Sequence, residues 1–402
     1  MSAPALPVLV AGGGIGGLAA ALALARRGMH VKVLEQAARL GEIGAGIQLG
    51  PNAFAAFDAL GMGEHIRSLA ICTDEMVMHD ALSATVIGRI PTGADFRRRF
   101  GNPYAVIHRA DMHQALIEAV HATERVEVLT STTAQRVEQD SSSVTVHDAR
   151  GHMHRGAALV GADGVKSIVR SQYVGDTARV SGDVIYRTVV DRADFPLDLQ
   201  SNAASIWVGP GCNLVHYPLR GAEQYNVVIT FQSGRQEEWG VSEGSAEEVK
   251  RHFDGMGICP RASQLIEALR SWRRWATADR EPIGQWTYGA AHRATLLGDA
   301  AHPTLQDMAQ GACMALEDAV TLGEAMQAHR DDFAEAFKLY ERSRIARTAR
   351  IVLSSREFRR FCGARGVERL VRNEMWRGRT PERFYDALEW LYGWHAKDCL
   401  AA

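Results

Sequence analysis

The chain has 402 residues, of which 46% are hydrophobic and 23% are charged, so it can bury a large core in one or two interleaved domains. Its formal net charge of -2 excludes a strongly basic surface of the kind that binds nucleic acid or anionic membranes, and we expect small-molecule partners. The 6 cysteines are widely separated and form no CxxC pair, so we expect reduced thiols, no metal site and a cytoplasmic location.

The first predicted element is a βαβ unit with a glycine motif. Residues 8–11 form an apolar strand, 15–27 a helix rich in Ala and Leu, and 31–34 a second strand that ends at Glu35. Gly12, Gly14 and Gly17 supply GxGxxG between the first strand and the helix. These glycines permit a tight turn, close approach of a pyrophosphate and close helix packing, and Glu35 can accept hydrogen bonds from an adenosine ribose. The unit predicts a dinucleotide site and leaves NAD and FAD open.

The same amino-terminal segment bears on targeting. Glycines interrupt its apolar run repeatedly, and no basic region precedes it. We therefore expect neither a secretory signal peptide nor a membrane-spanning helix here.

The pattern changes between residues 182 and 231. Four short β-like runs follow one another here, separated by Gly, Pro and polar turns: "GDVIYRTVV", "ASIWVG", "NLVHYPL" and "QYNVVITF". Such runs are typical of an antiparallel sheet. We predict a second module inserted at this point of the chain.

A second glycine-containing turn follows at residues 294–302, "ATLLGDAAH". An apolar strand runs into Gly298 and Asp299, and this acid can bond a ribityl hydroxyl that FAD has and nicotinamide dinucleotides lack. Residues 309–320 then form a glycine turn that enters a helix, whose first NH groups can face the carbonyl edge of a flavin. This segment favours FAD. We expect His302 to fix the turn rather than to act as an acid or base.

The carboxyl-terminal part returns to helix. Residues 332–360 have helical periodicity. The tail "FYDALEWLYGWHAKDCL" is aromatic enough to need a packing partner, and we expect it to form core rather than a docking site.

Several motifs in this order resemble the flavoprotein aromatic hydroxylases. "GADGVKSIVR" matches the family's DG motif with Asp163, and "GDAAHP" its second FAD fingerprint. The longer similar stretches are "GEIGAGIQLGPNA", "FGNPYAVIHRADMH", "VHYPLRG", "SWRRWATADREPI" and "LLGDAAHPTLQDMAQGACMALEDAV". They are most similar to the group of 3-hydroxybenzoate 6-hydroxylases, with salicylate 1-hydroxylases and 6-hydroxynicotinate 3-monooxygenases as related groups.

The resemblance implies an α/β fold. It consists of a Rossmann-like FAD-binding domain with an inserted antiparallel-sheet substrate domain and a C-terminal helical segment. We place the FAD-binding domain at residues 1–180 and 275–330, the substrate-binding sheet domain at 181–274 and the helical region at 331–402.

The resemblance also implies a reaction. A single-component monooxygenase of this kind reduces FAD with NADH or NADPH, binds O2 and hydroxylates a phenolic aromatic acid through a flavin C4a-hydroperoxide. The substrate it favours is 3-hydroxybenzoate, giving gentisate, and a homodimer is possible. The alternatives are decarboxylating hydroxylation of salicylate to catechol, hydroxylation of 6-hydroxynicotinate, an FAD-dependent dehydrogenase, and a flavin-binding protein without catalysis.

The residues implied for the cofactor site extend beyond the first glycine motif. They are Ala45, Gly46, Arg109, Asp163, Asp299, Gly311 and Ala312 in addition to Gly12, Gly14, Gly17 and Glu35.

The substrate-site candidates come from the inserted sheet and from the second fingerprint. Strand alternation in "GCNLVHYPL" sends Asn213 and Tyr217 to one face and His216 to the other. Gln306 matches a family glutamine beside the flavin. Asn213 departs from the pattern, because the similar enzymes have at this position a histidine implicated in phenol activation, and an amide cannot hold a proton. The predicted catalytic set is therefore Tyr217, Gln306, Asn213 and His216.

Overall fold

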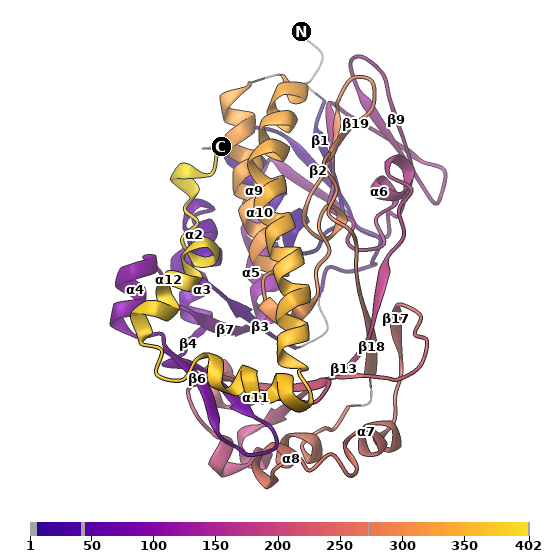
Figure 1. Cartoon of the computed structure of the whole chain (residues 1–402). Helices are drawn as coiled ribbons and strands as arrows, with labels where there is room; N and C mark the ends of the chain where they lie inside the picture. Colours follow the sequence, from indigo (N-terminus) through magenta and orange to yellow (C-terminus); the bar gives the residue numbers. More distant parts are fainter. Residues whose placement is uncertain (1–5, 42–44, 272, 331, 401–402) are drawn as a thin grey trace.

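The computed structural model describes residues 6–41, 45–271, 273–330 and 332–400. Figure 1 shows two layered regions joined by long helices, with both ends of the chain near the top of the view. Glu42, Ile43, Gly44 and Trp272, which belong to the family-like stretches quoted above, lie outside the described residues. No helix of the described residues is long and apolar enough to cross a membrane.

A six-stranded sheet forms the first region. Its strands, in spatial order, are β19 (Thr287–Tyr288), β20 (Ala294–Leu296), β12 (Ala158–Gly161), β1 (Val8–Ala11), β2 (Val31–Leu34) and β8 (Val126–Leu129). All neighbours pair in parallel except β19 with β20. The helices nearest the cofactor motifs are α1 (Ile15–Arg26), α5 (Arg109–His121) and α9 (Gly311–Ala328). This confirms the predicted βαβ unit to within one residue and the helix after the second fingerprint.

The strands of this region are apolar because they are covered on both faces. Every residue of β1 and β12 is buried, and α1 contributes small side chains to the same core. Late strand β20 joins early strand β12 through the pair Leu159 and Ala294. The chain therefore returns to its first sheet after the second region is complete.

Two small sheets accompany this region. One contains β9 (Ala134–Gln139), β10 (Val144–Asp148) and β11 (Met153–Gly156), and the other β3 (Gly46–Leu49), β7 (Ala105–His108) and β4 (Ile71–Cys72). The second of them connects the cofactor region to the larger sheet, because β7 packs near β15 (Cys212–Leu219) of that sheet.

An eight-stranded sheet forms the second region. Its spatial order is β17 (Gly240–Glu243), β18 (Arg273–Asp279), β13 (Arg179–Asp191), β16 (Gln224–Gln232), β15 (Cys212–Leu219), β14 (Ala203–Gly209), β5 (Glu75–Asp80) and β6 (Val86–Pro91). The four predicted strands pair antiparallel as expected, whereas β14 and β5 pair in parallel. Because β5 and β6 come from the first hundred residues, this sheet draws on more of the chain than residues 181–274. The domain limits themselves stay a prediction.

The remaining helices cover the two sheets. They are α2 (Pro51–Ala59), α3 (Gly63–Leu69), α4 (Ala94–Phe100), α6 (Ile168–Tyr173), α7 (Ala246–Phe253), α8 (Pro260–Glu267), α10 (Phe333–Cys362), α11 (Gly366–Met375) and α12 (Pro381–Tyr392). Single 3-10 turns are η1 (Arg192–Asp194), η2 (Leu197–Leu199), η3 (Arg220–Ala222), η4 (Gly298–Ala300), η5 (Gln306–Met308) and η6 (Ala396–Asp398).

The helix α10 spans both regions, as Figure 1 shows. Near its start, Tyr340 donates its hydroxyl to Leu296 O of β20 at 3.1 Å. Near its end, Arg359 binds both carboxylate oxygens of Asp183 in β13 at 2.8 and 2.6 Å. Thirty helical residues are about 45 Å long, so one rigid element fixes the two sheets relative to each other.

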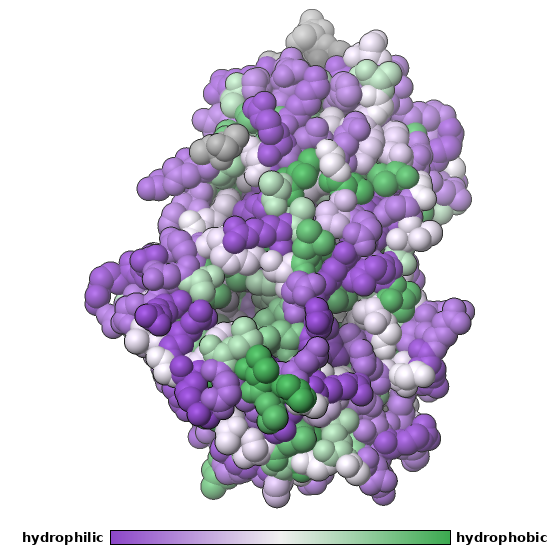
Figure 2. All heavy atoms as spheres, in the orientation of Figure 1, coloured by the Kyte–Doolittle hydropathy of each residue, from purple (hydrophilic) through white to green (hydrophobic). Residues whose placement is uncertain are grey.

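The aromatic tail packs as core, as predicted. Tyr385 and Tyr392 of α12 meet Phe96 and Phe100 of α4 with ring centroids 5.5 to 6.0 Å apart. The surface is mostly hydrophilic in Figure 2, with a hydrophobic cluster toward the lower middle. The exposed apolar side chains of α11 in this part of the molecule are Val367, Leu370, Val371 and Met375.

Candidate active site

In the first glycine motif, two positions have no room for a side chain, and the third is open. Gly12 has a φ of +103°, and a Cβ on it would clash with Ala162 O. A Cβ on Gly17 would clash with Gly12 O. A Cβ on Gly14 would have no atom of the described residues within 4 Å. The free approach at Gly14, beside the start of α1, fits the pyrophosphate of a dinucleotide.

The acid at the end of β2 is held against this loop. Glu35 Oε2 accepts a hydrogen bond from Gly13 N at 2.6 Å, and Oε1 accepts one from Ala37 N at 2.7 Å. Each carboxylate oxygen has a second lone pair, so Glu35 can still accept from a ribose hydroxyl. The loop and the predicted acid therefore form one unit.

The DG motif supplies a carboxyl oxygen without a protein partner. Asp163 Oδ2 accepts from Ile168 N at 2.8 Å and Val169 N at 3.3 Å, which caps α6. Asp163 Oδ1 is buried and has no hydrogen-bond partner among the described residues. Burial raises the pKa of Asp163. A buried acceptor of this kind needs a donor, and a cofactor hydroxyl or amide fits it.

The DG motif also reaches the second fingerprint. Arg170 of α6 donates from Nη1 to Ala301 O at 2.7 Å and to Ala300 O at 3.2 Å. The structure therefore brings together two motifs that are about 130 residues apart.

Asp299 lies between this turn and α9. It is accessible to solvent, yet the protein around its carboxyl raises its pKa. A Cβ built on Gly311, the first residue of α9, would be 3.9 Å from Asp299 Oδ1. No side chain caps this helix start, so the backbone NH groups at Gly311 and Ala312 stay available to a ligand. This arrangement fits the ribityl chain and the carbonyl edge of a flavin.

A buried charge cluster supports the turn from behind. Asp318 of α9 accepts from Gly298 N at 3.0 Å, contacts His302 Nε2 at 2.6 Å and accepts from Arg344 Nε at 2.7 Å. Arg344 also pairs with Glu317 at 2.7 Å. Asp318 thus holds His302 at Nε2 behind the turn, whereas the buried Nδ1 of His302 has no hydrogen-bond partner among the described residues.

The third part of the cofactor site adjoins the eight-stranded sheet. Arg109, the first residue of α5, donates from its backbone N to Ala45 O at 2.8 Å. Gly46 N donates to Asn226 Oδ1 at 2.8 Å. A Cβ on Gly46 would be 2.8 Å from the hydroxyl oxygen of Tyr217. The predicted cofactor residues Ala45, Gly46 and Arg109 therefore lie beside the predicted substrate residue Tyr217.

Strand β15 divides the predicted catalytic residues between two faces. Asn213 and Tyr217 share one face, and both are 3% exposed. Burial raises the pKa of Tyr217, so its hydroxyl stays protonated and can donate a hydrogen bond. His216 lies on the other face, 5.7 Å from the ring of Phe195, and burial lowers its pKa to about 3. The structure does not bring His216 together with the other candidates.

Gln306 covers the face that carries Asn213 and Tyr217. Its Oε1 accepts from Arg187 Nη2 at 2.7 Å, and its Nε2 donates to Thr230 Oγ1 at 2.7 Å. These two partners were missed from the sequence. The only signal for Arg187 is a single charge inside the apolar run "VIYRTVV".

Asn213, which departs from the histidine of the family pattern, contacts an acidic residue. Asn213 Nδ2 donates to Asp307 Oδ1 at 3.3 Å. Burial raises the pKa of Asp307 to about 6. Where a histidine was expected, the chain therefore has an amide next to a carboxyl group that can titrate near neutral pH.

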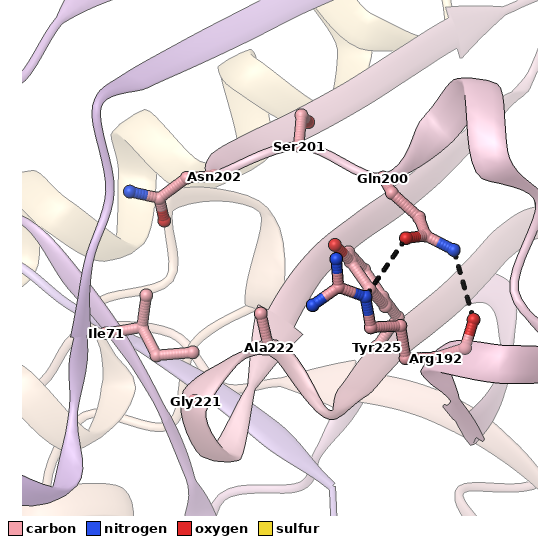
Figure 3. Close-up of a pocket in the computed structure, with 8 residues that line it drawn as sticks. All are labelled: Ile71, Arg192, Gln200, Ser201, Asn202, Gly221, Ala222 and Tyr225. Carbon is pink, nitrogen blue, oxygen red and sulfur yellow. Dashed lines mark hydrogen bonds between the residues drawn. The ribbon is translucent and has the colours of Figure 1, made fainter.

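A separate surface pocket of about 390 Å³ lies on another part of the same sheet region, and Figure 3 shows its lining. Arg192 there donates from Nε to Gln200 Oε1 at 3.2 Å, and Gln200 Nε2 donates back to Arg192 O at 3.0 Å. None of the predicted cofactor or catalytic residues lines this pocket. The cluster of fingerprints and sheet residues is thus the better candidate active site.

Comparisons with known proteins identify the family of the chain. Residues 5–355 match the model of a family described as "FAD binding domain". A 3-hydroxybenzoate 6-hydroxylase of Polaromonas naphthalenivorans is 69% identical over 396 residues, which are 98% of each chain. A 3-hydroxybenzoate 6-hydroxylase of Klebsiella oxytoca is 54% identical over the full length of both chains. Among solved structures, HpxO of Klebsiella pneumoniae complexed with FAD and uric acid has a TM-score of 0.84 at 28% identity, covering 96% of this chain and 97% of its own.

Proposed function

The chain belongs to the FAD binding domain family of flavoprotein aromatic hydroxylases, and we propose that it converts 3-hydroxybenzoate to gentisate with NADH and O2. The observation that carries the proposal is the 69% identity to a 3-hydroxybenzoate 6-hydroxylase over nearly the whole chain. The grouping of Tyr217, Gln306 and Asn213 beside the three cofactor motifs supports it.

FAD supplies the redox chemistry when bound, taking electrons from the nicotinamide and activating O2. The residues that would hold it are Gly12, Gly14, Gly17 and Glu35 at the adenosine end, and Asp163, Asp299, Gly311 and Ala312 toward the flavin end. Ala45, Gly46 and Arg109 would contact it beside the substrate sheet.

The protein's own part in the reaction is to bind and orient the phenol. Tyr217 is a protonated donor, and Gln306 is held in one orientation by Arg187 and Thr230. Apolar neighbours of Tyr217 in the same cluster, Val106, Val215 and Leu219, exclude water from the reacting ring. NADH rather than NADPH as donor, and a homodimeric assembly, remain predictions.

A product assay tests the proposal. The FAD-loaded protein is given NADH, air and either 3-hydroxybenzoate, salicylate or 6-hydroxynicotinate, and products are separated chromatographically. We expect gentisate from 3-hydroxybenzoate, in proportion to the NADH consumed. Catechol and CO2 from salicylate would replace the proposal with decarboxylating hydroxylation, and NADH consumption with no organic product would contradict both.

A further inference from the structure

Arg187 lies in the middle of the sheet face that carries the predicted substrate residues. In the register of the sheet, Arg187 of β13 is opposite Val228 of β16, which in turn is opposite Val215 of β15. Directly paired residues share a face, and Val215 lies between Asn213 and Tyr217 along β15. The guanidinium therefore belongs to the same face as Asn213 and Tyr217, and its bond to Gln306 confirms this placement.

Arg187, which is half-buried, differs in its partners from the buried arginines of the chain. Arg344, Arg359 and Arg274 each form ion pairs with carboxylates at 2.5 to 2.9 Å. In the described part of the chain, Arg187 forms no ion pair, and its one side-chain hydrogen bond goes to the neutral amide of Gln306. Burial lowers the pKa of Arg187, and the positive charge of Arg109 adds to this effect.

An enclosed cation without an anion is costly, and this cost is removed when an anion binds. The bond to Gln306 uses one of the five N–H donors of the guanidinium, so donors remain for both oxygens of a carboxylate. The substrate class of the proposed function has one group that is ionised at neutral pH, the ring carboxylate, whereas the phenol is still protonated.

We infer that Arg187 binds the carboxylate of the aromatic acid substrate and thereby selects aromatic acids over neutral phenols. This inference rests on the proposed function for the identity of the ligand. In this assignment the charge that binds the acid lies on β13, whereas Tyr217 and Gln306 contact the ring and its hydroxyl.

Binding of two ligands that differ only in charge tests the inference. The FAD-loaded protein is titrated with 3-hydroxybenzoate and with neutral 3-hydroxybenzamide, and the dissociation constants are taken from the change in flavin absorbance. Arg187→Gln should weaken binding of the acid by about 10- to 100-fold, because a charge-assisted hydrogen bond is lost. Binding of the amide should change by less than about threefold, and Arg187→Lys should give an intermediate loss for the acid.

Arg192→Gln is the matched control, because Arg192 is an exposed arginine just after the same strand and lines the separate pocket of Figure 3. It should leave binding of both ligands unchanged. A loss of acid binding in Arg192→Gln but not in Arg187→Gln would move the acid site to that pocket and overturn the inference. Equal losses of the acid and the amide in Arg187→Gln would overturn it too, since Arg187 would then only shape the site.

The folding of the variants separates binding from structure. Arg187 has no carboxylate partner among the described residues, so Arg187→Gln should lower the unfolding temperature only slightly, through loss of the bond to Gln306. Failure of the proposed function would give a different result, because the unmodified protein would then form no gentisate. If the present inference alone fails, the unmodified protein still forms gentisate, and Arg187→Gln either keeps its acid binding or loses binding of the acid and the amide equally.

Discussion

Gly46 and Tyr217 are in such close contact that residue 46 has no room for a side chain. A Cβ on Gly46 would be 2.8 Å from the hydroxyl oxygen of Tyr217 and 2.9 Å from Cβ of Asn226. Distances under 3 Å between such atoms force one of them to move. The cofactor-side strand β3 therefore sets the position of the tyrosine on the substrate-side sheet.

Gly46→Ala should displace the ring of Tyr217 and lower the turnover of 3-hydroxybenzoate by about tenfold or more, since small misplacements of positioning groups have large effects on rate. The measurement is the rate of gentisate formation per bound flavin, with flavin content determined in parallel. Gly284→Ala is the control, because a Cβ on Gly284 would have no atom within 4 Å. Unchanged turnover in Gly46→Ala would show that the position of Tyr217 does not matter.

Asp299→Ala should weaken FAD binding. One charge-assisted hydrogen bond is worth roughly 1.5–3 kcal/mol, so the dissociation constant of FAD should rise by about 10- to 100-fold. Flavin fluorescence during dilution of the loaded protein measures it. Asp194→Ala, an exposed acid in η1, should have no effect. An unchanged dissociation constant for Asp299→Ala would remove the ribityl assignment.

Arg344→Met should destabilise the protein strongly. It removes the arginine partner of the buried Asp318 carboxylate and leaves the buried Glu317 carboxylate with Arg347 alone, which costs about 3–5 kcal/mol. Lys338→Met, on the same helix, breaks an exposed pair with Glu335 and should leave the unfolding temperature nearly unchanged. Thermal unfolding of both FAD-loaded variants tests this difference. Equal unfolding temperatures would mean that the cluster does not stabilise the turn.

Asn213→His should raise turnover above about pH 6.5, where a neutral imidazole can accept the phenol proton. Its neighbour Asp307 would also orient the new ring. The pH profile of kcat should gain a limb with a midpoint near the histidine pKa, and Asn213→Gln should not show it. A profile that is the same for His and Gln at position 213 would mean that this position does not contact the phenol proton.

Asp307→Asn should stabilise the protein at neutral pH and not at low pH. Burial raises the pKa of Asp307 in the folded state from 3.8 to about 6, so the folded protein binds this proton more tightly than the unfolded chain. The stability that follows is complete below about pH 4 and is lost as pH rises to about 6. Unfolding temperatures at pH 4.5 and 7.5 test this, with Asp194→Asn as control. A stabilisation of Asp307→Asn that is equal at both pH values would contradict the raised pKa.

The fold elements that depend on local patterns could be predicted from the sequence. The glycines between β1 and α1 require special backbone geometry, and the alternating runs in β13 to β16 reveal strands whatever their partners are. The pairing of β5 with β14 could not be predicted, because nothing within residues 75–80 specifies a parallel neighbour more than 120 residues away. Such pairing is decided by tertiary packing rather than by local propensity.

The candidate site divides in the same way. Gly12, Asp163 and Asp299 belong to motifs whose residue spacing is enough to predict a cofactor site. Arg187 and Asp307 do not, because their neighbours are known only once the register of β13, β15 and β16 is fixed and η5 is packed against it. The sequence shows which residues are unusual, whereas the register shows which of them meet.

The late pairing of β20 with β12 has a consequence for synthesis on the ribosome. Leu159 can pair with Ala294 only after a further 135 residues have been synthesised. At roughly 5–20 residues per second, the edge of β12 stays open for about 7 to 27 s. An open strand edge is prone to wrong pairing, so nascent chains should depend on chaperones during this interval. Flavin can enter its complete site only after α9 has emerged, and a shortage of FAD would then leave a finished but unliganded chain exposed to proteolysis.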